Sequence, residues 1–193
     1  MNNTVLANKE VNVLQAINLT LATSAFLALA DSLPKLVDFA GKLSIGKTLY
    51  VSLLIFWTVK LLVENHKSFA GARVLARPGY AVFQLMMTVV MFLALSVSAK
   101  NADHFILSVE WLGVALSAGL VWLFGLAISF GTNFDRRLYP WIWPASAIVT
   151  VVGAFFLANR DASADSWTAA GVVGIMLLAV VFDAIRSKSF SAA

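Results

Sequence analysis

The sequence predicts an all-α integral membrane protein, a bundle of about six transmembrane helices. The stretch FILSVEWLGVALSAGLVWLFGLAISF at 105–130 carries one formal charge, Glu110, and no proline. As an α-helix it would be about 39 Å long, more than the ~30 Å of a bilayer's hydrocarbon core. The whole chain is 60% hydrophobic and 12% charged, about half the charged fraction of ordinary soluble domains. Lipid is therefore the expected solvent of its apolar segments.

Six apolar segments alternate with polar connections. The predicted spans are 13–33, 48–63, 80–98, 105–130, 141–157 and 167–183. A chain of 193 residues then forms one transmembrane domain, with no room for a soluble one. Five or four spans is the alternative if the first or second segment lies at the membrane surface. The connection 99–104 is short enough to require a tight hairpin, so the flanking spans should be antiparallel neighbours.

A break in the first helix is expected near its end. Ser32 precedes Leu33 and Pro34, a sequence typical of an N-cap followed by a proline in the first helical turn. The segment PKLVDFAGKL that follows has apolar residues on one side. This pattern predicts a short second helix lying on the membrane surface.

The positive residues predict the orientation. With six spans, nine of them share a side with the termini: Lys9, Lys60, Lys67, Arg73, Arg77, Arg136, Arg137, Arg186 and Lys188. Five lie on the other side: Lys35, Lys42, Lys47, Lys100 and Arg160. We therefore expect a multi-pass membrane protein with both termini in the cytoplasm. The expected location is the bacterial inner membrane.

Polar residues within the spans are the first places to look for function. Asp31 and Glu110 are expected near the outer ends of their spans, either as interfacial carboxylates or as an acidic entrance to a pathway. Gln15 and Asn18 continue a stripe of amides along one face of the first helix. Amides facing lipid would be unsatisfied, so the stripe either bonds neighbouring helices or lines a hydrated conduit.

Other ionisable residues favour structural interpretations. Lys60 is expected one turn from the end of its span, snorkelling to the surface and pairing with Glu64. Asp183 and Arg186 are spaced as an i, i+3 pair at a helix end, typical of an anchor. The chain has no cysteine and two histidines, and its pattern shows neither a metal-ligand cluster nor a catalytic triad. We therefore expect no enzyme activity and no cofactor.

Two functions remain open. The first is a small channel or passive permease for an ion or small solute, formed by a homo-oligomer, with Asp31, Glu110, Gln15 and Asn18 along the pathway. The second is a non-transporting subunit that docks a soluble cytoplasmic protein through basic loops. Its docking residues would be His66, Lys67, Arg73, Arg77, Arg136 and Arg137. The basic residues are scattered between apolar spans, which argues against nucleic acid as a partner.

Overall fold

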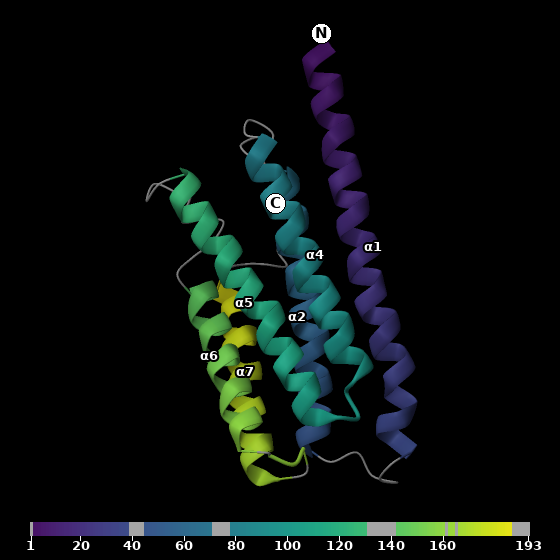
Figure 1. Ribbon diagram of the computed structural model, residues 1–193, viewed down its shortest axis with the longest axis vertical. Helices are drawn as coiled ribbons and strands as arrows, with labels where there is room; N and C mark the ends of the chain where they lie inside the picture. The colour runs from purple at the N-terminus through teal and green to yellow at the C-terminus, as the bar shows by residue number, and fades with distance from the viewer. Residues whose placement is uncertain are drawn as a thin grey trace.

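The computed structural model is a bundle of α-helices (Figure 1). Residues 2–38, 45–70, 78–130, 142–160, 162–164 and 166–186 are described by the structure, and side chains for a smaller set within them. The helices are α1 (Asn2–Asp38), α2 (Ile45–Ala70), α4 (Pro78–Lys100), α5 (Phe105–Phe130), α6 (Ile142–Asn159) and α7 (Trp167–Arg186). Five are long and apolar enough to cross a membrane, and α6 is a shorter apolar helix. The predicted all-α membrane bundle is confirmed.

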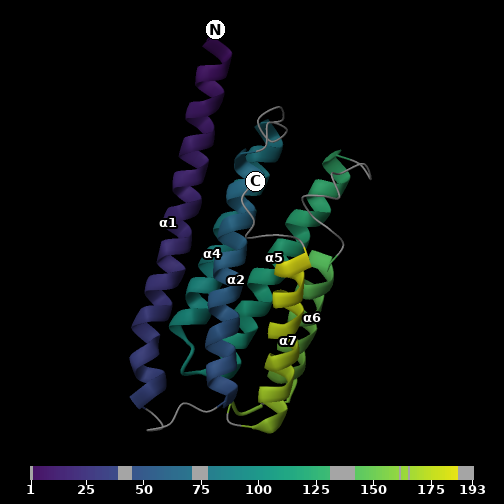
Figure 2. The same ribbon diagram turned by 180° about the vertical axis from the view of Figure 1, so that it is seen from behind.

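The helices alternate in direction and form a closed ring. Around the bundle the packing order is α1, α4, α5, α6, α7, α2 and back to α1, and α2 also touches α4 across the ring. We call the end where α1 begins and α2 finishes the upper end, which is the top of Figures 1 and 2. Helix α7 also finishes toward this end. The ring gives every helix an inner face shielded by its neighbours and an outer face.

The outer face of the ring is apolar. Large hydrophobic side chains between 65% and 70% exposed occur on four different helices: Leu27, Phe124, Phe155 and Leu178. A water-soluble protein would expose a patch of this kind only at an interface. Here such side chains recur around the bundle, as expected of a surface solvated by lipid.

The expected break in the first helix is wrong. Helix α1 continues through Pro34 to Asp38. The hydroxyl of Ser32 does not cap a new helix, because it donates to the carbonyls of Ala28 at 2.8 Å and Ala99 at 2.6 Å. Proline's fixed φ is compatible with an α-helix, and at this place its missing N–H removes one hydrogen bond close to the helix end. The rest of the predicted surface helix, 39–43, lies outside the described residues.

At the lower end, hydrogen bonds run across the ring from α2 to α4 and α5. The Tyr50 hydroxyl of α2 lies 3.2 Å from Ser98 Oγ on α4 and 2.8 Å from Ser108 Oγ on α5. Each of these serines donates to the other's backbone carbonyl, at 2.7 and 2.6 Å. The tight hairpin between α4 and α5 is confirmed, with the His104 amide bonded to the Asn101 carbonyl at 2.9 Å. Three helices are therefore held in fixed register at this end.

Candidate functional site: a polar layer inside the ring

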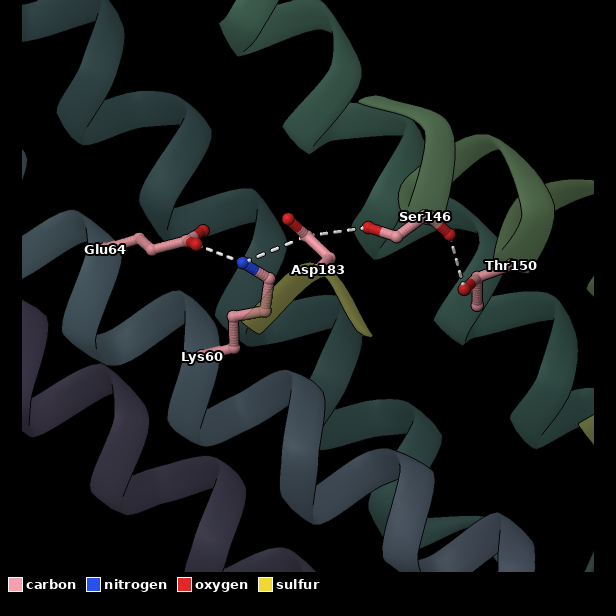
Figure 3. Close-up of polar contacts among 5 residues, drawn as sticks. All are labelled: Lys60, Glu64, Ser146, Thr150 and Asp183. Carbon is pink, nitrogen blue, oxygen red and sulfur yellow. Dashed lines mark hydrogen bonds and ion pairs between the residues drawn. The ribbon is translucent and has the colours of Figure 1, made fainter. Parts of the chain in front are cut away.

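A lysine lies buried between two carboxylates in the upper half of the ring (Figure 3). Its Nζ atom is 3.1 Å from Asp183 Oδ2 on α7 and forms a close ion pair with Glu64 on the next turn of α2. The side chains of Lys60 and Asp183 are fully buried, and that of Glu64 is 8% exposed. The Lys60 side chain therefore connects two helices, and its partner Asp183 is 123 positions away in the chain.

Helix α6 extends this cluster. Ser146 Oγ donates to the same Oδ2 atom of Asp183 at 2.8 Å, and Thr150 Oγ1 donates to the Ser146 carbonyl at 2.9 Å. Figure 3 shows the resulting line of contacts from Glu64 through Lys60 and Asp183 to Ser146. Three consecutive helices of the ring, α2, α7 and α6, thus share one polar network.

The sequence interpretation of these ions is corrected in two respects. Lys60 pairs with Glu64 as expected, but it points into the ring and does not snorkel to the surface. Asp183 is buried and pairs with Lys60, whereas Arg186 is exposed. Spacing within one helix could not reveal a contact between α2 and α7. The available signal was the rule that ionisable residues within a span face the bundle interior and pair there.

Further buried polar side chains lie at the height of this cluster. The bond between Tyr50 and Ser98 fixes α2 relative to α4. Asn65 lies fifteen residues above Tyr50, and Gln84 fourteen residues above Ser98, or about 22 and 21 Å at 1.5 Å per residue. By the same measure Thr88 lies about 15 Å above Ser98, level with Lys60 on α2. Asn65, Gln84 and Thr88 are all fully buried.

Asn18 completes this layer from α1. It is fully buried, and its Nδ2 donates to the Leu62 carbonyl of α2 at 3.1 Å. Leu62 is three residues before Asn65. We use the name polar layer for the buried polar residues at this height: Asn18, Lys60, Glu64, Asn65, Gln84, Thr88, Ser146 and Asp183.

At Asn18, Asn65 and Thr88 of the polar layer, four side-chain atoms have no hydrogen-bond partner among the described residues. They are Asn18 Oδ1, both side-chain polar atoms of Asn65, and Thr88 Oγ1. A buried polar atom left without a partner costs about 1–3 kcal/mol. Such atoms in a membrane protein face protein or a hydrated space. The part of the layer between α1, α2 and α4 therefore has unused hydrogen-bonding capacity.

Two of the predicted pathway residues are separated from this layer. Asp31 on α1 and Glu110 on α5 are both exposed, toward the lower end. Helix α4 lies between their helices in the ring. The structure therefore does not gather them into one acidic site within a single chain. Of the predicted pathway set, Asn18 is the member that reaches the ring interior.

Gln15 lies instead in a groove on the outside of α1 and α2. The groove has a volume of about 420 Å³ and is lined by Gln15, Ala16, Leu19, Leu62, Val63, His66 and Lys67. Of the predicted docking residues, His66 and Lys67 are therefore placed together, near the upper end of α2. The remaining four, Arg73, Arg77, Arg136 and Arg137, lie outside the described residues.

Neither metal chemistry nor resemblance points to a function. Among the residues that the structure describes, no three His, Cys, Asp or Glu side chains are grouped in a way that could hold a metal ion. The chain matches no protein-family model, and no curated protein or solved structure shows significant similarity to it.

Proposed function

We propose that the protein is a membrane transport protein, a channel or passive permease for an ion or small solute, and that its conduit runs through the interior of the helix ring. The observation that supports this proposal is the polar layer inside the ring. It consists of eight polar side chains from α1, α2, α4, α6 and α7, and three of them are ionisable. The outer face of the same bundle is apolar. Ionisable side chains in the membrane are expensive and typically mark pathways for ions or substrates.

The arrangement supports a conduit with two unlike ends. Toward the upper end, Glu64 is the member of the ion cluster with measurable exposure. Toward the lower end, the bonded group around Tyr50 holds α2, α4 and α5 together, with apolar side chains such as Phe92 and Leu112 fully buried above it. In a conduit through the ring, these apolar side chains would form a constriction that gates by excluding water. Passage would then require the lower end to open.

Helix separation at the lower end would have a fixed pivot. The ion cluster ties α2 to α7 and α6, so these three helices would move together, while α4 and α5 are joined by the hairpin. The motion expected for transport is therefore a displacement of α4 and α5 away from α2. A conduit in this place lies within one chain, so homo-oligomerisation stays a prediction on which the proposal does not depend.

The experiment is flux from vesicles containing the purified protein. Vesicles loaded with potassium chloride, urea or glycerol should lose at least one of these faster than protein-free vesicles. Thr88→Leu adds bulk to the polar layer and should slow that flux several-fold. The matched control is Thr168→Leu, the same change at an exposed position of α7, which should leave the flux unchanged.

Either of two results would reject the proposal. Vesicles containing correctly folded protein could be as tight as protein-free vesicles to all three solutes. Alternatively, Thr88→Leu and Thr168→Leu could have equal flux, which would place the conduit elsewhere.

A further inference from the structure

The Thr88 hydroxyl lacks the local hydrogen bond that most hydroxyls of the described helices make. The hydroxyls of seven other helical Ser and Thr residues donate to the carbonyl four residues earlier: Thr20, Thr23, Ser32, Ser52, Thr58, Ser96 and Thr150. This local bond is the usual arrangement for such residues within helices. Thr88 Oγ1 has no hydrogen-bond partner among the described residues, although the side chain is fully buried. Its hydroxyl is therefore available to something between the helices.

Asn65 and Asn18 present complementary groups to the same region. Asn65 offers its whole amide, two N–H donors and one oxygen, and Asn18 offers its unpartnered Oδ1, while one N–H of its Nδ2 donates to the Leu62 carbonyl. Together with the Thr88 hydroxyl, the three residues provide three acceptor oxygens and donors from two side chains. They come from α2, α1 and α4, three helices in mutual contact.

These three residues are uncharged, and the ions of the layer point elsewhere. Asn65 follows Lys60 by five residues, which turns it about 140° around α2 at 3.6 residues per turn. Lys60 is directed at α7, where it contacts Asp183, so Asn65 is directed toward the α1 and α4 side. A ligand among Asn18, Asn65 and Thr88 would meet amide and hydroxyl groups. Uncharged groups of this kind favour a neutral ligand, since burying an ion without a counter-charge is far more costly.

Along the bundle axis, the three residues differ in height by no more than the length of one small molecule. Heights are measured along the bundle from the Tyr50–Ser98 bond. Thr88 lies about 15 Å above this bond, the Leu62 carbonyl that binds Asn18 lies about 18 Å above it, and Asn65 lies about 22 Å above it. A height of about 7 Å suits a solute of a few heavy atoms that spans all three side chains.

We propose that Asn18, Asn65 and Thr88 form a binding site for a small uncharged solute that both donates and accepts hydrogen bonds, of the kind represented by urea and glycerol. The proposal rests on the proposed transport function and assigns its substrate class. Bound solute satisfies the four unpartnered atoms, and it leaves when the surrounding helices separate.

Flux of urea and glycerol from vesicles tests this assignment. Thr88→Val keeps the shape of the side chain and removes its hydroxyl, and Asn65→Leu does the same for the amide. Each should slow urea and glycerol efflux at least about fivefold, the effect of one buried hydrogen bond lost from the bound solute. The control is Thr58→Val, at another buried threonine, whose hydroxyl bonds the Leu54 carbonyl at 2.8 Å, and it should retain the wild-type rates. Monodisperse elution and unchanged helicity establish that each variant is folded.

Potassium chloride and water flux, measured in the same vesicles, separate the possible failures. Flux of salt without urea or glycerol would overturn the binding site and leave the transport function standing. Flux of water alone would mean that the unpartnered atoms bind water, and would also overturn it. Equal urea and glycerol rates in Thr88→Val and Thr58→Val would have the same consequence. Vesicles tight to every solute would reject the transport function itself.

Discussion

Replacing Lys60 with methionine should destabilise the folded protein more than any single change to its partners. Lys60→Met keeps most of the side-chain volume but removes the ammonium group that lies between Glu64 and Asp183. Two carboxylates would then face each other in a buried site. Breaking a buried ion pair by removing one partner typically costs 3–5 kcal/mol, because the remaining charge is uncompensated. We therefore expect a loss of about 4 kcal/mol in the free energy of unfolding.

Asp183→Leu should cost less, because Lys60 retains Glu64 as an ion-pair partner. The double variant, Lys60→Met with Asp183→Leu, removes one charge of each sign, and replacing buried ion pairs by apolar groups is often close to neutral. Its loss should therefore be smaller than the sum of the two single losses, by more than about 1 kcal/mol of coupling.

Unfolding in detergent micelles, followed by tryptophan fluorescence, measures all three variants. Lys100→Met, which changes an exposed lysine at the end of α4, is the control and should stay within about 0.5 kcal/mol of wild type. A loss for Lys60→Met no larger than that for Lys100→Met would contradict the role given to the buried ammonium group. Strict additivity of the Lys60 and Asp183 changes would refute it equally, since residues in contact should couple.

Three further changes probe the packing of the ring, each measured by the same unfolding assay. Tyr50→Phe removes the hydroxyl bonded to two serines and should cost about 1 kcal/mol, and a neutral result would argue against that lower-end network. Gly46→Ala should destabilise by about 1–3 kcal/mol, because its Cβ would collide with the backbone carbonyl of Ala164, whereas Gly171→Ala, with open space at its Cβ, should be neutral or slightly stabilising. Asn65→Leu should leave the unfolding temperature unchanged or raise it, because the amide makes no hydrogen bond to the described residues that could be lost; a lower temperature would mean that the amide bonds to protein.

Much of the fold could be predicted, because the length of each apolar segment and the length of each connection can be read directly from the sequence. The 105–130 helix is predicted with the bounds that α5 has, and the short connection after Lys100 requires the hairpin that the structure contains. Pro34 is ambiguous in the sequence, because proline occurs in the first turn of a new helix and is also tolerated near the end of a continuing one. Tertiary contact decided between them, since the Ser32 hydroxyl bonds Ala99 on α4.

The candidate site was less predictable, because it depends on which helices are neighbours. The sequence predicts that Asn18 either bonds another helix or lines a conduit. Its Nδ2 bonds the Leu62 carbonyl, which confirms the interhelical bond, while its Oδ1 has no hydrogen-bond partner among the described residues. Lys60 and Asp183 each have an oppositely charged residue nearby in the sequence, Glu64 and Arg186. These local pairs are sufficient to explain both residues, so the sequence does not indicate the contact between α2 and α7. The ring order of the helices, which hydropathy does not encode, is what places them together.

The most direct test of the account is whether water reaches the polar layer. The chain contains no cysteine, so single cysteines can be introduced without further changes and treated with a small, hydrophilic thiol reagent in vesicles. Thr88→Cys and Asn65→Cys should react, although both positions are fully buried among side chains, because a hydrated conduit passes them. Leu112→Cys, equally buried but in the apolar part of the ring, should stay unreactive. If the cysteines at 88 and 65 were as inert as the one at 112, the ring interior would be dry and the account would be contradicted.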